Sequence, residues 1–211
     1  MNSFLSKKTG YYIIFAAFCT AGIIFDFIKF PAPIIFPDFL KMDISVIPSV
    51  IIAFTFGVLP GILLEFIKNT VHLFIFYEDS KSINEIANFI INCSFIYCAG
   101  ALYTKNITKK NAVIGCLLGS LAITAAAAFI HNSFVIPAYD EILYHTPEDI
   151  IEAVQKTIPF VKTQTEYILY CITPFYLLKG LLATGITVLI YKKIEPLLNW
   201  HEYYPDENQN E

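Results

Sequence analysis

The sequence predicts an all-α integral membrane protein with six transmembrane helices. Of its 211 residues, 56% are hydrophobic, and the charged residues, 15% of the chain, cluster between long apolar runs. The mean hydropathy is +0.58. A water-soluble core of this size does not need so much apolar surface. Long apolar runs separated by charged loops are expected when the runs cross a bilayer as helices.

The boundaries of the spans follow from run length and from helix breakers. A helix needs about 20 apolar residues to cross a bilayer. The run 44–77 is too long for one crossing, and the segment 57–61, Gly-Val-Leu-Pro-Gly, divides it because glycine and proline break helices. The first run has no cleavage site of the A-x-A kind at its end, so we expect it to be retained. The predicted spans are 11–30, 45–56, 59–76, 84–103, 112–137 and 167–191; they form one domain, 1–200, before a disordered cytoplasmic tail, 201–211.

The distribution of lysines predicts the orientation, because cytoplasmic loops carry an excess of basic residues. With the N-terminus inside, the cytoplasmic segments contain Lys7, Lys8, Lys105, Lys109, Lys110, Lys192 and Lys193. Both termini are therefore expected in the cytoplasm, and the long loops 31–43 and 140–166 are expected outside. A short helix is predicted to begin at Pro147, since proline suits the first helical position and acids follow it.

Several classes of function are excluded or disfavoured by what the sequence lacks. The chain contains no arginine, which removes any bidentate guanidinium clamp, and no basic face remains for nucleic acid. It has no phosphate-binding Walker loop, no H-E-x-x-H zinc motif and no G-x-S-x-G nucleophile elbow. We therefore expect a binding protein with no metal and no cofactor, and we do not expect an enzyme.

Lys179 is the strongest candidate for a functional residue. It lies in the middle of the last span, within the segment 174–180, Pro-Phe-Tyr-Leu-Leu-Lys-Gly. An ammonium at that depth costs several kcal/mol unless a polar group meets it. Because the same helix has no acid within one turn of Lys179, we expect a bound ligand to supply its missing partner.

The other candidate ligand-binding residues share a place in the outer half of the predicted bundle. They are Met42, Asp43, Glu85, Asn88, Asn132, Phe175 and Tyr176. Aromatic walls with a few directional polar groups suit a small, flat, amphipathic ligand. Two alternatives stay open: the asparagines could serve as interhelical hydrogen-bond glue, and Glu85 could face water. Lys68, three residues after Glu65, is expected to form a structural ion pair.

Two pairs of small residues predict close helix packing. They are Ala17-x-x-x-Ala21 in the first span and Gly115-x-x-x-Gly119 in the fifth. Small residues at this spacing let helix backbones approach one another. The spacing does not say whether the partner helix belongs to this chain or to another protein.

Six segments together resemble a known family of membrane proteins. They are 36–48, 56–61, Lys68-Asn69, 85–89, Asn132 and 174–180. Their order and placement resemble the riboflavin-specific S components of energy-coupling factor (ECF) transporters. The resemblance implies a multi-pass cell-membrane protein that captures riboflavin outside and joins one transmembrane coupling subunit and two cytoplasmic ATPases.

The resemblance also implies roles for particular residues. Met42 and Asp43 would cap the pocket, Asn132 and Lys179 would hydrogen-bond the ligand, and Phe175 would wall it. The small-residue face formed by Ala17 and Ala21 would pack on the coupling subunit.

Two positions depart from the family pattern, and three other functions stay open. Relatives usually carry Asp where this chain has Val46, and Asn where it has Tyr176. An S component for thiamin or a pyridoxal-like vitamin is the first alternative. The second is a membrane-embedded enzyme that uses Glu65, Lys68 and His72 for acid-base chemistry. The third is a purely structural membrane subunit.

Overall fold

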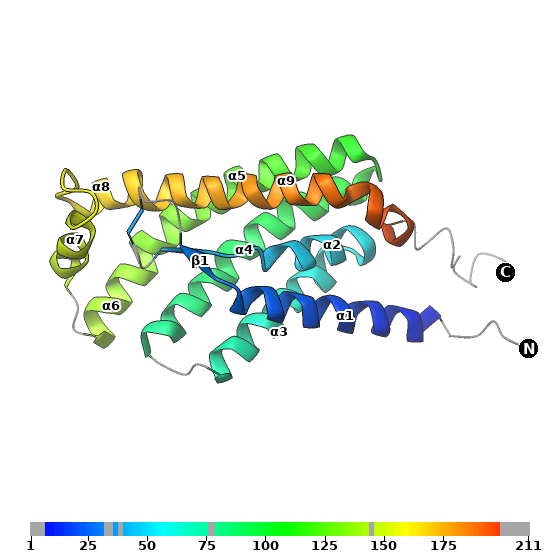
Figure 1. The fold of residues 1–211 in the computed structure, drawn as a ribbon, viewed down its shortest axis with the longest axis horizontal. Coiled ribbons are helices and arrows are strands. Elements are labelled where there is room, and N and C mark those ends of the chain that lie inside the picture. Colours follow the sequence, from blue (N-terminus) through cyan, green and yellow to red (C-terminus); the bar gives the residue numbers. More distant parts are fainter. Residues whose placement is uncertain (1–6, 32–35, 38–39, 76–78, 144–145, 199–211) are drawn as a thin grey trace, which may run out of the picture.

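The computed structural model describes residues 7–31, 36–37, 40–75, 79–143 and 146–198, and these residues are almost entirely helical (Figure 1). The helices are α1 (Lys7–Phe27), α2 (Val46–Phe56), α3 (Val58–Ile75), α4 (Asp79–Lys105), α5 (Lys109–Ile130), α6 (Ile136–Leu143), α7 (Pro147–Gln155), α8 (Gln164–Tyr167) and α9 (Thr173–Leu198). Two π-helical turns, η1 (His131–Val135) and η2 (Ile168–Ile172), join α5 to α6 and α8 to α9. A two-residue antiparallel pair, β1 (Phe30–Pro31) and β2 (Lys41–Met42), closes the loop after α1.

Five helical segments of the described chain are long and apolar enough to cross a bilayer, and α2 is apolar but shorter. The predicted all-α membrane class is therefore confirmed. The cytoplasmic placement of both termini stays a prediction, and the tail 201–211 lies outside the described residues.

The break between α2 and α3 lies at Gly57, inside the predicted breaker segment. Gly57 has a φ of 99°, a conformation that side chains with a Cβ rarely adopt. Its backbone N–H donates to the carbonyl of Ala53 at 3.1 Å and so caps α2. After this turn α3 packs tightly on α2, because a Cβ at Gly61 would lie 2.7 Å from the carbonyl oxygen of Ser49.

Helix α4 lies at the centre of the bundle and contacts α2, α3 and α5, while α5 also packs on α9. The glycine pair of α5 packs within this chain rather than on another protein. Gly115 lies against the backbone of Ala99 in α4, and Gly119 lies against Phe95.

We expect Gly115→Ala to destabilise the protein by about 1–3 kcal/mol, because the new methyl group overpacks the α4–α5 contact. A Cβ there would lie 2.8 Å from the carbonyl oxygen of Ala99. Gly185→Ala in α9 is the matched control, since a Cβ at Gly185 meets nothing within 4 Å. Thermal unfolding of the purified protein in detergent measures both. Equal melting temperatures for the two variants would contradict this packing.

The two ends of the bundle differ in construction. The start of α1 and the end of α9 lie at one end, whereas α6, α7 and α8 lie at the other (Figure 1). The strand pair aligns Phe30 with Met42, so the loop after α1 returns across the bundle and delivers Asp43 to the start of α2. The second end therefore gathers loops and short helices around the helix ends.

Candidate functional site

A cavity of about 1040 Å³ opens at the end of the bundle that carries α6, α7 and α8. Its wall is built by the end of α1 and residues of the segment that follows it up to Asp43, by α3, the first half of α4, η1, α6, α7 and α8, and by α9. Charged, amide and aromatic side chains all reach it. This size matches the upper end of ordinary small-molecule sites, about 300–1,000 Å³.

Lys179 and Asp43 form a buried ion pair on the cavity wall. The Lys179 ammonium lies 2.8 Å from Asp43 Oδ2, and both side chains are buried. The backbone N–H of Ser45 donates to the other carboxylate oxygen, Asp43 Oδ1, at 3.0 Å. Burial opposes ionisation of this carboxyl, but the Lys179 and Lys68 ammonium groups outweigh it and hold the pKa of Asp43 below its ordinary value.

This pair corrects one expectation from the sequence. We expected the Lys179 ammonium to lack a partner until a ligand supplied one, and that expectation is wrong. The last helix has no acid within one turn of Lys179, whereas Asp43 is 136 positions away in the chain. What remains beside the pair is the open cavity, so a ligand would meet an ion pair rather than a lone cation.

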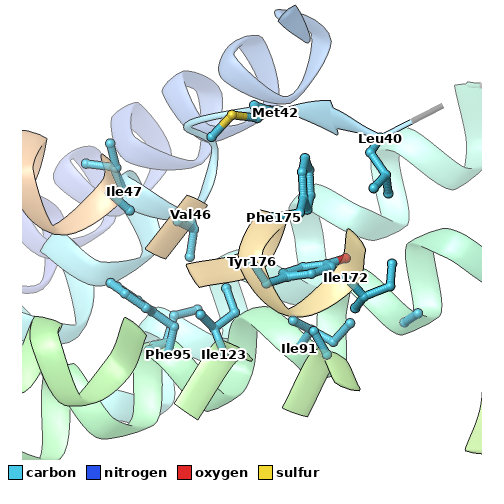
Figure 2. Packing of buried hydrophobic residues seen from close by; sticks show 14 of the residues in the cluster. Leu40, Met42, Val46, Ile47, Ile91, Phe95, Ile123, Ile172, Phe175 and Tyr176 are labelled. Atoms are coloured by element: carbon cyan, nitrogen blue, oxygen red, sulfur yellow. The ribbon is translucent and has the colours of Figure 1, made fainter. Parts of the chain in front are cut away.

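Aromatic rings cover the wall next to this pair. Phe175 and Tyr176 lie perpendicular to each other with ring centroids 5.2 Å apart, and the His131 ring lies 5.7 Å from Tyr176. The Lys179 ammonium lies 6.0 Å from the centre of the Tyr176 ring. Figure 2 shows Phe175 and Tyr176 in one buried cluster with Leu40 from the loop. The wall therefore offers flat apolar surface beside charge.

Asn88 and Glu85 lie on the α4 wall of the cavity. The Asn88 amide oxygen lies 3.5 Å from the Lys179 ammonium. Its amide nitrogen donates to Asn69 on α3 at 3.2 Å, so it also joins two helices. Glu85 is buried and lies 3.0 Å from His72 Nδ1, which makes the alternative that it faces water wrong.

Two residues implied by the resemblance do not line the cavity. Met42, in β2, is buried and belongs to the hydrophobic cluster (Figure 2). Asn132 is exposed, and its amide oxygen accepts a hydrogen bond from Gln164 at 3.0 Å. His131 continues the buried face of α5, four residues after Ala127, and reaches the wall in place of its neighbour; a π-helical turn begins at this residue. Irregular turns of this kind are frequent at functional sites.

Helix α7 covers the cavity, and its start is fixed by local sequence. Thr146 accepts a hydrogen bond from the backbone N–H of Asp149, and the Asp149 carboxylate accepts one from Thr146 N–H at 2.8 Å. Pro147 occupies the first turn, as predicted. Asp149, Ile150 and Ala153 of this helix line the cavity.

Glu65 and Lys68 form a second buried pair, with 2.6 Å between Lys68 Nζ and Glu65 Oε1. The predicted structural ion pair is confirmed. Neither residue lines the cavity. His72 lies instead beside Asp26 and Glu85, so the acid-base group that we considered for an enzyme is not assembled.

Several residues that line the cavity were not selected from the sequence, among them Asp26, Tyr139 and Tyr167. A signal for Asp26 was present, because an acid inside a predicted span is a functional candidate by default. The two tyrosines are aromatic side chains whose orientation depends on how the helices pack.

The small residues of α1 face away from the core. Ala17 is exposed and Ala21 is half-buried. Within the chain α1 packs on α2 and α3. The Ala17 side of α1 is thus available to lipid or to another protein.

Comparison with known proteins gives the family. The family of the substrate-specific component of ECF transporters matches residues 11–191. The chain is 28% identical over 114 residues to the riboflavin transporter FmnP of Bacillus subtilis (strain 168), which covers 54% of each protein. It is 26% identical over 111 residues to the riboflavin transporter RibU of Streptococcus thermophilus (strain ATCC BAA-250 / LMG 18311), which covers 53% of this chain and 47% of RibU. The matched part spans about half the length of these curated relatives.

The fold agrees with this match. A solved structure described as the S component of a bacterial ECF transporter superimposes with a TM-score of 0.69 and 21% identity, and the match covers 90% of this chain and 98% of that one. Members of this family are multi-pass membrane components of transporters and are not enzymes. The chain therefore belongs to the family of substrate-specific components of ECF transporters.

Proposed function

We propose that this chain captures riboflavin, or a closely related flavin, in the cavity described above and delivers it for uptake across the membrane. The observation that carries this proposal is the combination of perpendicular aromatic rings with a buried ion pair on one cavity wall. A flavin has a flat ring system edged by polar atoms and a flexible hydroxylated chain. The names of two curated relatives support the same ligand.

The side chains of the wall match both parts of a flavin, its flat ring system and its polar atoms. Phe175, Tyr176 and His131 offer surfaces on which a flat ring can stack. Lys179 offers donors and Asn88 offers an amide to ring carbonyls or hydroxyl groups. No chemistry on the ligand is required, because capture needs only these contacts.

Energy for transport would come from other subunits, since the chain has no phosphate-binding loop. We infer one transmembrane coupling subunit and two cytoplasmic ATPases as partners. The exposed face of α1 at Ala17, with Ala21 beside it, is the surface proposed for the coupling subunit, because small residues permit close helix approach. With the termini in the cytoplasm, as the lysines predict, the cavity opens on the extracellular side.

The test is an absorption spectrum and a ligand titration of the protein purified in detergent. We expect the protein to be yellow when it is prepared from cells that contain riboflavin, and ligand-free protein to quench the fluorescence of added riboflavin. Thiamin and pyridoxal are titrated in parallel. Colourless protein that binds one of these instead would replace the flavin and leave the family assignment intact.

Two asparagines provide the matched control for this titration. Asn88→Ala should weaken riboflavin binding by the value of one hydrogen bond, about 0.5–1.5 kcal/mol, because Asn88 lines the cavity. Asn132→Ala should leave the affinity unchanged, because Asn132 is exposed and bonded to Gln164. The reverse result would favour the placement implied by sequence resemblance over the placement seen in the structure.

A further inference from the structure

Three helices bring metal-ligating side chains together at one corner of the cavity. Asp26 comes from the last turn of α1, His72 from α3 and Glu85 from α4, and all three are buried. One nitrogen or oxygen atom from each lies within 4.8 Å of the others. All three residues line the cavity, so the corner can be reached from it.

Two carboxylate oxygens at this corner have no hydrogen-bond partner among the described residues. They are Asp26 Oδ2 and Glu85 Oε2, on side chains whose residues are only 1% and 6% exposed. Asp26 Oδ2 points into the group, 3.7 Å from His72 Nε2. Buried carboxylate oxygens without partners are costly, and a bound cation removes that cost.

The corner already attracts one cation from the protein itself. The Lys29 ammonium lies 3.4 Å from His72 Nε2 and 3.7 Å from Glu85 Oε1. Its side chain is 31% exposed, so it can leave without opening the core. No ion pair in the described part of the chain joins Lys29 to Asp26, and one ammonium does not balance two carboxylates.

We propose that Asp26, His72 and Glu85 bind a divalent transition metal ion such as Zn²⁺. Zinc accepts an imidazole nitrogen and carboxylate oxygens together, and sites with three protein ligands leave a coordination position open. Magnesium and calcium prefer oxygen ligands alone, so the histidine disfavours them. Ligand atoms around tetrahedral zinc lie about 3.4 Å apart, which these side chains reach by small rotations.

The metal would act on the fold and on the cavity at once. It would tie α1, α3 and α4 together at the rim, and its open position would face the cavity. It would also compete with the Lys29 ammonium for the same imidazole and carboxylate atoms. Removal of that lysine charge should therefore tighten metal binding.

The experiment is calorimetric titration of Zn²⁺ into chelator-stripped, ligand-free protein in detergent. We expect one saturable site in the wild type. Asp26→Asn and His72→Gln should each weaken binding by at least about tenfold, and Lys29→Met should tighten it by about tenfold, in the range that single residues around metal sites contribute. His131→Gln is the matched control, because this second buried histidine lies outside the group and should leave Zn²⁺ affinity unchanged.

Every outcome decides the proposal. Absence of saturable binding to the wild type overturns it, and this includes the case in which only Lys29→Met binds, because Lys29 then holds the site in the native protein. Equal loss in His131→Gln and His72→Gln also overturns it. If Asp26→Asn folds poorly, the gain in Lys29→Met still decides once that variant is shown to unfold at the wild-type temperature, because the cysteines of an unfolded chain can also bind Zn²⁺. Riboflavin titration of the same metal-free protein tests the flavin proposal separately.

Discussion

Lys179→Met is expected to destabilise the protein by about 3–5 kcal/mol, because it leaves the Asp43 carboxylate buried without its cation. The two groups lie 2.8 Å apart and both are buried. Asp43→Asn should have an effect of similar size, because it leaves the Lys179 ammonium buried without its carboxylate partner. Unfolding of the purified variants in detergent measures the change in free energy.

The double variant Lys179→Met/Asp43→Asn separates pairing from ligand binding. It should recover much of the lost stability, because no unpaired charge remains at the site. Riboflavin binding should stay weakened by about 1.5–3 kcal/mol, the value of a hydrogen bond to a charged group. If the double variant regains full affinity together with stability, Lys179 serves only to hold the loop, and its proposed contact with the ligand is wrong.

Glu65→Ala should destabilise the protein by about 3–5 kcal/mol, because it removes the carboxylate at the centre of a buried hydrogen-bond network. Glu65 Oε1 accepts from Lys68 at 2.6 Å, from Asn92 at 2.8 Å and from Asn69 at 3.0 Å. Glu65 Oε2 accepts from the Ser49 hydroxyl at 2.7 Å. The same unfolding measurement applies.

The matched comparison is the double variant Glu65→Ala/Lys68→Met, which removes the stranded ammonium and should be more stable than Glu65→Ala alone. Riboflavin affinity of the folded double variant should equal that of the wild type, because neither residue lines the cavity. A loss of affinity as large as in Lys179→Met would show that this network also shapes the site.

Several residues selected from the sequence as ligand contacts line the cavity together with Lys179. They are Asp43, Glu85, Asn88, Phe175 and Tyr176, and their role in binding stays a prediction. Their predicted place in the outer half of the bundle was enough to select them. Asp26, which also lines the cavity, was not selected, although an acid inside the predicted span 11–30 could have indicated it.

Two expectations from the sequence failed for different reasons. Asn132 was expected at the cavity, but His131, four residues after the buried Ala127, continues the buried face of α5 and lines the wall instead. Lys179 was expected without a carboxylate, but Asp43 arrives from a loop far away in the chain. The helical period of α5 could have indicated the first, whereas no local pattern indicates the second.

The sequence by itself determined that this chain forms membrane-crossing helices, that a turn at Gly57 divides α2 from α3, and that a capped helix starts at Pro147. These features depend on hydrophobicity over a short window and on the backbone preferences of single residues. Only the tertiary structure decided which charges pair and which face the cavity. Those contacts depend on the rotation of each helix about its axis and on where loops return, and no local stretch of sequence specifies either.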